Sequence, residues 1–331
     1  MRADPVDYLV IGAGISGLAC AEALHKAGRS VVVLDKGRGF GGRLATRRMD
    51  GARIDHGAQY FTVRDERFRK YVDEWLAAGV IREWFRHLPI DSNPEGYPRY
   101  CGVNGMTDVP KYLARALTVH RSQQVVEVVK ELGYWELHTQ VGDRFEGRHL
   151  VVAAPLPQAM SILQTSGVNW ARDDLPKLNK IAYEKGLAAL VVLDGPSGIP
   201  DPGGMKVDSE VINWIGDNQQ KGISPDVSAV TIHGTADFSA KHWDTPDSLR
   251  GQLMLDAAAP YLKSKVTNIA CHRWGFTTPL NPWPEASYHN FEIALSLAGD
   301  AFGGPRVEGA FLSGLHAAET LLNKKCGMVS S

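Results

Sequence analysis

The sequence lacks the features that mark secreted, zinc-binding or membrane-spanning proteins. It has four cysteines in 331 residues, and none of them form a C-x-x-C pair. Their wide spacing argues against a disulfide framework or a zinc site and favours a reducing compartment. No run of 18 or more apolar residues is present, so no membrane span is expected. The cysteines are predicted to be buried small residues or unremarkable thiols, and they are Cys20, Cys101, Cys271 and Cys326.

A strong charge of either sign is also missing. The formal net charge is −1, and no cluster of Lys and Arg with interleaved aromatics suggests a nucleic-acid surface. The histidines show no metal-ligand spacing, so no metal is expected. The hydrophobic content of 44% and the charged content of 22% are ordinary for a globular protein. The length allows one large or two medium domains.

The most informative stretch lies near the start of the chain. Tyr8–Ile11 is apolar without alternation, as in a buried parallel strand. Three glycines at the spacing G-x-G-x-x-G follow, namely Gly12, Gly14 and Gly17. Asp4 and Asp7 precede the run and the glycines interrupt it, so we interpret it as a first strand and not as an export signal. The protein is therefore expected to be cytoplasmic.

The residues after the glycines complete a strand–helix–strand unit. A small and apolar helical stretch ends at Gly28, and Ser30–Leu34 is a second apolar strand that ends at Asp35. The spacing from Gly12 is 35 − 12 = 23 positions, close to the roughly 20 at which dinucleotide-binding folds carry an acid for the ribose. This predicts an α/β, Rossmann-type domain whose helix N-terminus receives phosphates. The predicted cofactor-binding residues are Gly12, Ala13, Gly14, Ile15, Ser16, Gly17, Asp35 and Lys36.

A second glycine-rich loop follows at once, and arginines accompany it. Lys36–Arg48 combines four glycines with several arginines, a composition that suits an anion-binding concavity. Its Gly-Gly-Arg sequence, Gly42 and Arg43 included, and the later turn Gly57–Tyr60 resemble the flavin amine oxidase superfamily. The resemblance implies that Arg43 meets the pyrophosphate of FAD and that Ala58, Gln59 and Tyr60 lie along the flavin.

The C-terminal part of the chain carries a further motif of that superfamily. Leu295–Asp300 is an apolar strand ending in Gly-Asp, and Val307-Glu308-Gly309-Ala310 opens a helix. An NAD dehydrogenase does not need this second motif, so it favours FAD over NAD. The resemblance implies cofactor contacts at Asp300, Val307, Gly309 and Ala310, with Val126 near the adenine and Ala154 on a strand returning to the cofactor.

The middle of the chain departs from the dinucleotide pattern. Apolar strands at Leu187–Leu193 and Val227–His233 alternate with Gly/Pro/Asp loops. We expect a discontinuous FAD-binding domain of the p-hydroxybenzoate hydroxylase or amine oxidase type, with an inserted α+β substrate domain. The FAD-binding domain is assigned to 1–64, 100–160 and 291–331, and the substrate domain to 65–99 and 161–290. Other expected elements are an amphipathic helix over Glu66–Trp84, a β-meander over 124–146, a loop at Pro89–Pro98 and helices at Val109–Leu117 and Ser248–Leu262.

The motifs also bear on the reaction. Amine oxidases commonly carry an aromatic residue just before the Glu-Gly-Ala run, whereas this chain has Arg306 nearby, which would repel an ammonium and attract a phosphate or carboxylate. The compact length, the opening run, the Gly-Gly-Arg loop and Gly57–Phe61 resemble bacterial renalases. That resemblance implies a non-covalent FAD oxidase of 2- and 6-dihydro-NAD(P), which forms NAD(P)⁺ and hydrogen peroxide with dioxygen.

Such a reaction needs no side-chain base, and no catalytic side chain is assigned. The residues expected to hold the dinucleotide substrate are Tyr60, Arg64, Trp274 and Arg306. Three alternatives remain open: a flavin-containing amine oxidase, an FAD-dependent monooxygenase or desaturase, and a non-enzymatic FAD-binding protein.

Overall fold

The described chain packs as two compact units. A computed structural model of the protein describes residues 4–88 and 95–324. Unit 1 is formed by the described residues of Met1–Gly42, Pro110–Ala182 and Pro279–Ser331, and unit 2 by those of Arg43–Val109 and Tyr183–Thr278. The predicted loop Pro89–Pro98 lies partly outside the described residues, and Cys326 lies wholly outside them.

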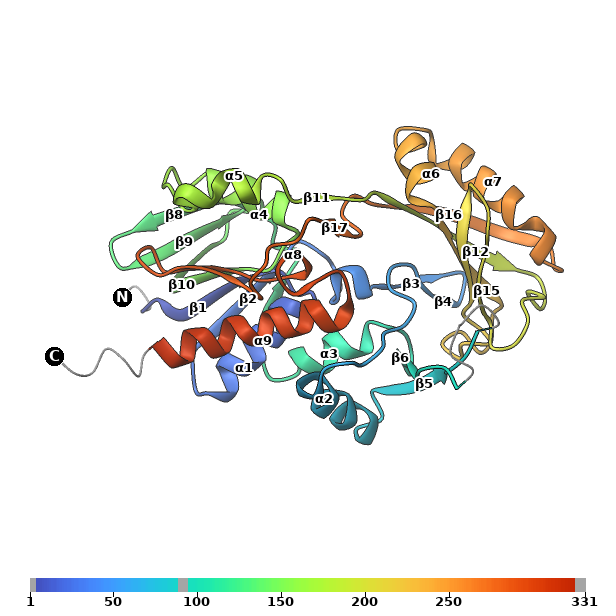
Figure 1. Ribbon diagram of the computed structural model, residues 1–331, viewed down its shortest axis with the longest axis horizontal. Helices are drawn as coiled ribbons and strands as arrows, with labels where there is room; N and C mark the ends of the chain where they lie inside the picture. Colours follow the sequence, from blue (N-terminus) through green and yellow to red (C-terminus); the bar gives the residue numbers. More distant parts are fainter. Residues whose placement is uncertain (1–3, 89–94, 325–331) are drawn as a thin grey trace. The chain divides into compact units, whose positions relative to one another are not determined.

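Unit 1 is built on a mostly parallel sheet (Figure 1). Its strand order is β18-β19-β10-β1-β2-β7, and β1, β2, β7, β10 and β19 run parallel. The predicted meander is confirmed as β8, β9 and β10, but the segment expected as a separate strand at 150–155 continues β10. The strands are β1 (Val6–Ile11), β2 (Val31–Asp35), β7 (Thr118–Arg121), β8 (Val125–Glu131), β9 (Tyr134–Thr139), β10 (Arg144–Val152), β18 (Tyr288–Asn290) and β19 (Leu295–Leu297).

Helices cover this sheet, and two of them pack closely on each other. α1 and α9 meet where Gly314 lies against Ser16, because a Cβ on Gly314 would overlap the Ser16 carbonyl group. The order of the elements confirms the predicted α/β Rossmann-like fold. The helices of unit 1 are α1 (Ile15–Lys26), α4 (Leu156–Gln164), α5 (Leu175–Leu178), α8 (Asp300–Gly303) and α9 (Val307–Lys324), and α3 (Asp108–Ala114) begins in unit 2.

We expect Gly314→Ala to destabilise unit 1. The added methyl group must push α9 away from backbone atoms, which is overpacking of about 1–3 kcal/mol. The matched control is Gly28→Ser at the end of α1, where a Cβ meets nothing within 4 Å and only the positive φ of +76° is strained. Thermal unfolding of both variants measures the difference. A loss in Gly314→Ala no larger than that in Gly28→Ser would contradict the close contact between α1 and α9.

Unit 2 contains an antiparallel sheet of order β13-β14-β15-β12-β16. One face of this sheet packs apolar residues such as Leu187, Val191 and Ile232 with Phe238 and Met254 of two helices, α6 and α7. The elements of the sheet layer are β12 (Gly186–Leu193), β13 (Gly204–Lys206), β14 (Ile212–Asp217), β15 (Ala229–Gly234), β16 (Val266–Trp274), α6 (Ala236–Lys241) and α7 (Asp247–Ala258).

A β-hairpin covers part of the opposite face. Ala52 and Ile54 of β4 pack with Ala188, Leu190 and Ala229 of the sheet. This packing places the segment after β4, which carries the predicted flavin-side turn, in unit 2. The remaining elements of unit 2 are β3 (Thr46–Met49), β4 (Ala52–Asp55), α2 (Glu66–Ala77), β5 (Ile81–Phe85) and β6 (Arg99–Gly102). Two short strands, β11 (Ala182–Tyr183) and β17 (Pro279–Leu280), pair with each other where the chain leaves one unit and enters the other.

The predicted helix over Glu66–Trp84 is too long. α2 ends at Ala77, where Gly79 adopts a φ of +67° and the Val80 N–H donates to the Trp75 carbonyl at 2.9 Å. The aromatic residues beyond this point belong to β5. The left-handed Gly79 therefore ends the helix well before Trp84.

The compact units also differ from the expected domain boundaries. Segments 43–64 and 100–109 pack in unit 2, because β4 covers the unit 2 sheet and β6 pairs with β5. Segments 161–182 and 279–290 pack in unit 1, where Tyr288 contacts both Trp170 and Trp283. The assignment of cofactor and substrate roles to domains remains a prediction.

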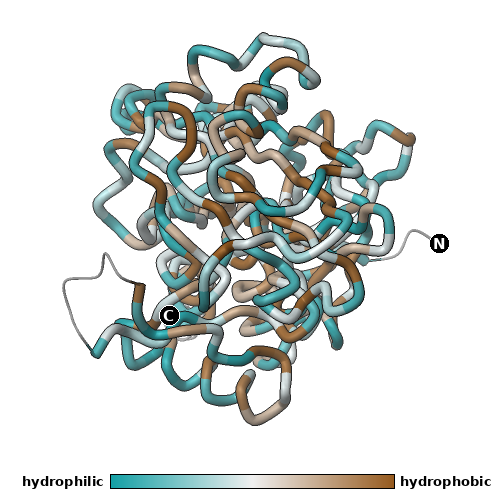
Figure 2. The backbone as a smooth tube through the Cα atoms, turned by 90° about the vertical axis from the view of Figure 1, so that its right-hand side faces the viewer, coloured by the Kyte–Doolittle hydropathy of each residue, from teal (hydrophilic) through white to brown (hydrophobic). Residues whose placement is uncertain are grey.

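Hydrophobic residues are dispersed along the chain in short segments, as the colours of the tube in Figure 2 show. Among the described helices, none is long and apolar enough to cross a membrane. Cys20 and Cys101 are buried and Cys271 is half-buried, and all three are free thiols. Burial raises the pKa of the Cys20 thiol to about 12, so it is not a reactive thiolate at neutral pH.

Candidate flavin and substrate site

The glycine loop after β1 has the backbone that the sequence predicts. Gly12 adopts a φ of +112°, which favours glycine, and a Cβ on Gly17 would overlap the carbonyl group of Gly12. The second glycine loop lies beside the first, because the Gly41 N–H donates to the Ala13 carbonyl at 2.9 Å. Gly42 also lies in this loop, and Lys36 is exposed beside it.

Asp35 holds the first loop in place. Its Oδ2 accepts a hydrogen bond from the Ala13 N–H at 2.6 Å, and its Oδ1 accepts one from the Gly37 N–H at 2.6 Å. A carboxylate offers about four lone-pair positions, so these two bonds leave capacity for ribose hydroxyls. The predicted ribose ligand is thus also the residue that braces the phosphate loop.

Unit 1 fits a dinucleotide cofactor in three respects. Ser16 Oγ is buried in the first turn of α1 and makes no hydrogen bond within the described residues, so a phosphate oxygen could supply its partner. A Cβ on Gly14 would meet nothing within 4 Å, which leaves open space above the loop. A Cβ on Gly299 or on Gly304 would also meet nothing within 4 Å, and these glycines flank α8 with φ values of +143° and +99°.

The other predicted contacts of unit 1 lie on several elements. Asp300 is buried at the start of α8, and Val307, Gly309 and Ala310 form the first turn of α9. Ala154 follows β10 and is half-buried. Val126 is 45% exposed at an irregularity of β8, and Arg306 is exposed just before α9.

The turn Gly57–Tyr60 is anchored to Arg43 within unit 2. The Ala58 N–H donates to the Arg43 carbonyl at 2.9 Å, and a Cβ on Gly57 would overlap that carbonyl group. The Arg43 guanidinium donates to the carbonyl of Thr277 at 3.2 Å, just beyond β16. The arginine of the Gly-Gly-Arg motif therefore joins the turn to the end of the sheet.

A fully buried ion pair lies behind this turn. Lys221 Nζ is 2.6 Å from Asp55 Oδ2, and neither side chain is exposed. The same ammonium donates to the Gln59 carbonyl at 2.5 Å and lies 4.9 Å from the centre of the Trp84 ring. Asp55 Oδ1 accepts from the Met106 N–H at 2.9 Å and from the Thr46 hydroxyl. The ion pair thus holds both Asp55, which precedes the turn, and the Gln59 carbonyl within it.

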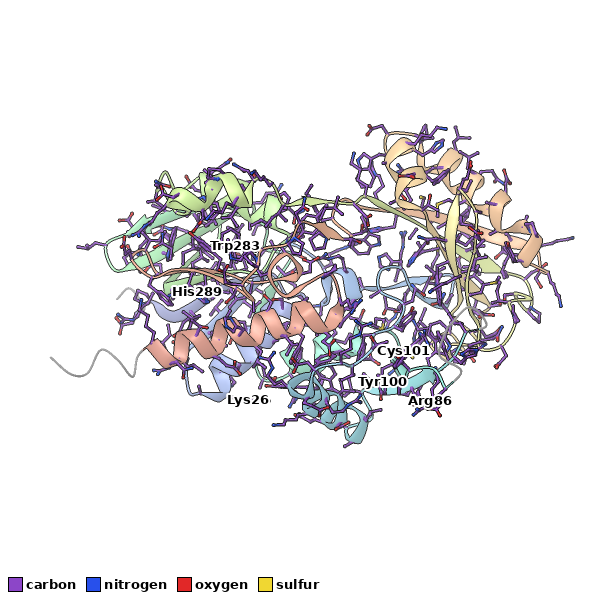
Figure 3. All side chains as sticks on the ribbon, in the orientation of Figure 1. Lys26, Arg86, Tyr100, Cys101, Trp283 and His289 are labelled. Carbon is purple, nitrogen blue, oxygen red and sulfur yellow. The ribbon has the colours of Figure 1, made fainter. Side chains whose placement is uncertain are left out.

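Tyr60 belongs to an aromatic cluster that also involves two cations. Its ring centre lies 5.7 Å from Phe85, 5.7 Å from Trp214 and 6.5 Å from Trp84. The Arg99 guanidinium lies 5.5 Å from the centre of the Tyr60 ring and 5.0 Å from that of Phe85. Figure 3 labels Tyr100 and Cys101, which follow Arg99 on β6.

Trp274 borders the other end of the turn. Its Nε1–H donates to the His56 carbonyl at 2.8 Å, and the rings of Trp274, His56 and His272 pack with centres 4.3–5.2 Å apart. Burial, together with His272 and Arg47, lowers the pKa of His56 to about 3, and burial also lowers the pKa of His272. Both imidazoles are therefore neutral at pH 7, and Trp274 forms part of an uncharged aromatic wall.

Sequence reasoning found some of these residues and missed others. Within unit 2 the structure joins Arg43, Ala58, Gln59 and Tyr60 in one turn, with Trp274 at its His56 end, while Arg64 is exposed beyond Tyr60. Sequence reasoning missed Asp55, Lys221, His56 and Trp214 as parts of this site. The chain separates Asp55 from Lys221 by 166 residues, so no local pattern links them. Among the described residues no group of His, Cys, Asp and Glu could hold a metal ion.

Comparison with known proteins defines the class. Residues 10–75 match the model of the NAD(P)-binding Rossmann-like domain, and residues 84–322 match that of the flavin-containing amine oxidoreductases. The second match covers most of the chain, which therefore belongs to the flavin-containing amine oxidoreductase family. The proteins that this model describes are flavin-containing oxidoreductases.

Individual relatives are similar over limited stretches. The chain is 38% identical to the putrescine oxidase of Kocuria rosea over 68 residues, which are 20% of this chain and 14% of that protein. It is 32% identical to the all-trans-retinol 13,14-reductase of Rattus norvegicus over 113 residues, 34% of this chain and 18% of that protein. The matched segments thus span less than a fifth of these two relatives.

Solved structures extend the likeness of the fold to nearly the whole chain. The cyclohexylamine oxidase of Brevibacterium oxydans IH-35A superposes with a TM-score of 0.74 at 13% identity, covering 97% of this chain and 99% of that one. A putrescine oxidase variant with redesigned cofactor binding gives a TM-score of 0.72 at 15% identity, covering 97% and 99%. At these identities the likeness establishes the fold alone.

Proposed function

We propose that the protein is a renalase-like FAD oxidase of isomeric dihydronicotinamide dinucleotides, the 2- and 6-dihydro forms of NAD(P). The overall reaction is dihydro-NAD(P) + O₂ + H⁺ → NAD(P)⁺ + H₂O₂. When bound, FAD supplies the redox chemistry, in which the dihydropyridine loses a hydride to flavin N5 and dioxygen is reduced. The alternative is oxidation of an amine, which the family membership also accommodates.

The observation that carries this proposal is the charge around Tyr60. A cationic amine is bound best by aromatic faces without a competing cation. Here the Arg99 guanidinium already lies over Tyr60 and Phe85, and the Lys221 ammonium lies over Trp84. An ammonium substrate at Tyr60 would be repelled by the Arg99 guanidinium, whereas an uncharged dihydropyridine ring would not be; the Lys221 charge is balanced by Asp55.

Further support comes from the other side of the turn. The neutral wall of Trp274, His56 and His272 offers flat surfaces for ring stacking. The exposed arginines of unit 2, Arg47 and Arg64, suit the phosphates of a dinucleotide. The protein's task in this proposal is to orient a ring from which no proton has to be removed.

The test is anaerobic reduction of the bound flavin. Isomeric dihydro-NAD(P) is expected to bleach the flavin absorbance at about 450 nm, a property of the cofactor itself, far faster than pure β-NADPH or an amine. Putrescine and cyclohexylamine serve as amine probes. Bleaching by an amine but not by the isomers would establish the amine oxidase alternative, and rapid bleaching by β-NADPH would favour a monooxygenase.

We also propose that FAD is bound without a covalent bond and that Asp35 anchors its ribose. Asp35→Ala should weaken FAD about tenfold to a hundredfold, because charge-assisted hydrogen bonds of roughly 1.5–3 kcal/mol are lost. Flavin retained after dialysis measures this effect, and acid precipitation should release all remaining flavin to the supernatant. Asp237→Ala, on α6 of unit 2, is the control. Full flavin content in Asp35→Ala would contradict the ribose role.

A further inference from the structure

A cavity in unit 1 lies at the end of the parallel sheet opposite to the glycine loop. Its volume is about 460 Å³, which is within the usual range for small-molecule sites. The walls come from the amino ends of β1, β2 and β7, from the end of α1 and from the segment before β7. The lining includes Val6, Gly28, Arg29, Val31, Val32 and Ala116.

The cavity is separate from the predicted cofactor site. β2 runs from Val31, which lines the cavity, to Asp35, which braces the glycine loop. Four steps along a strand span about 13 Å. Nucleotides bind open α/β sheets beyond the carboxyl ends of the strands, whereas this cavity lies at the amino ends. A molecule bound here would therefore be a second ligand, apart from FAD.

Arg29 brings an uncompensated positive charge to the wall of the cavity. Its side chain is half-buried, and its Nε is buried without a hydrogen-bond acceptor among the described residues. In the same part of the chain its guanidinium makes no ion pair. Two neighbouring cations differ, because Lys26 and Arg115 lie 3.1 Å and 3.5 Å from the Glu22 carboxylate. A partly desolvated cation without a counter-charge is unfavourable, so an anion in the cavity would stabilise it.

The groups around Arg29 are engaged elsewhere. The Leu24 carbonyl, at the end of α1, accepts from the Arg29 backbone N–H at 3.1 Å. Asp7 Oδ2 accepts from the Ser30 N–H at 3.0 Å and from its hydroxyl at 3.1 Å. A Cβ on Gly28 would meet nothing within 4 Å, so there is open space next to Arg29. A ligand can therefore reach this wall of the cavity.

We propose that the cavity binds a monocarboxylate with a short apolar chain, whose carboxylate accepts hydrogen bonds from the Arg29 guanidinium. Arg29 supplies one positive charge, and the nearby Asp7 carboxylate opposes a second negative charge on the ligand. Side chains of valine and alanine form the rest of the wall, which suits a hydrocarbon body better than a bare inorganic anion. Guanidinium groups match the two oxygens of a carboxylate.

Methyl NMR locates this binding without any assay of turnover. The purified protein carries ¹³C-methyl valine, and Val6, Val31 and Val32 report the cavity. Hexanoate is expected to shift these signals and to leave the flavin absorbance unchanged. Hexanol should bind about tenfold more weakly or worse, because it lacks the charge-assisted hydrogen bonds. Hexylamine and inorganic phosphate should not shift the valine signals.

Two variants and a matched control test the role of the guanidinium and of the space. Arg29→Gln removes the charge and should weaken hexanoate about tenfold or more. Ala116→Phe keeps the charge, fills the cavity from its exposed rim and should weaken hexanoate similarly. Arg48→Gln removes an exposed arginine that does not line the cavity, and it should change nothing. Thermal unfolding checks that each variant is folded, and Ala116→Phe remains decisive if Arg29→Gln is not.

Four results would overturn the proposal. Hexanoate without an effect on the valine signals would show that the cavity does not bind it, and unchanged affinity in Arg29→Gln would exclude the guanidinium as its partner. Phosphate that binds as tightly as hexanoate would define a site for inorganic anions. A change in flavin absorbance that follows the methyl shifts would assign hexanoate to the flavin site. None of these measurements depends on which substrate reduces the flavin.

Discussion

Lys221→Met is expected to lower the free energy of unfolding by about 3–5 kcal/mol, because it leaves a buried carboxylate without its counter-charge. Asp55 is fully buried, and its remaining donors, the Met106 N–H and the Thr46 hydroxyl, are neutral. The Gln59 carbonyl also loses the donor that fixes the turn. Chemical denaturation followed by tryptophan fluorescence measures the effect.

Two controls give this result its meaning. Lys177→Met makes the same change in an exposed pair, in which Nζ lies 2.9 Å from Asp174 Oδ1, and should leave the free energy of unfolding nearly unchanged. Adding Asp55→Asn to Lys221→Met should recover part of the stability, since the unpaired charge disappears. If Lys221→Met were as stable as Lys177→Met, the buried pair would not be the structural anchor described here.

Acid is expected to destabilise the protein between about pH 6.5 and about pH 3. Burial lowers the pKa of His56 and His149 to about 3 and that of His233 and His289 to about 4. Nearby positive charges lower these pKa values further, since Lys130 and Lys324 act on His149 and Lys221 acts on His233. Below the unfolded-state value of about 6.5, the unfolded chain binds more protons than the folded one, so stability falls with pH.

In unit 1 this sensitivity has a structural basis in a chain of hydrogen bonds. Ser296 Oγ bridges His149 Nε2 and His289 Nδ1 at 2.8 Å each, and Ser287 Oγ bridges His289 Nε2 at 2.7 Å and His316 Nδ1 at 2.8 Å. His289, labelled in Figure 3, lies on β18, and His316 lies on α9. Burial disfavours a positive charge on His149 and on His289, and a charge on His289 further disfavours one on His149, so the chain is stable with these imidazoles neutral.

The slope of stability with pH measures the contribution of a single histidine. His149→Gln should reduce the loss of stability on acidification by up to about 1.4 kcal/mol per pH unit. His25→Gln, at the exposed end of α1, is the control. Denaturant midpoints at pH 7, 6 and 5 give the slopes, and identical slopes for the two variants would exclude His149 as a source of the acid sensitivity.

The sequence by itself determined the nucleotide-binding half of the fold. β1, the glycine loop, α1 and β2 form a contiguous unit, and Asp35 lies only 22 residues from the Ala13 N–H that it accepts from. Such short-range patterns follow from periodicity, glycine conformations and strand ends, which each residue carries in its own chemistry. The C-terminal motif at α8 and α9 was recognisable for the same reason.

Only the tertiary structure decided what surrounds the turn at Gly57–Tyr60. Lys221 reaches Asp55, Gln59 and Trp214 both pack against Gly216, and Trp274 donates to the His56 carbonyl across 218 residues. These contacts depend on strand register and on which face of the unit 2 sheet β4 covers, because a shift of one residue would turn every side chain of a strand to the other face. The position of a single lysine or glutamine in the sequence does not indicate that register.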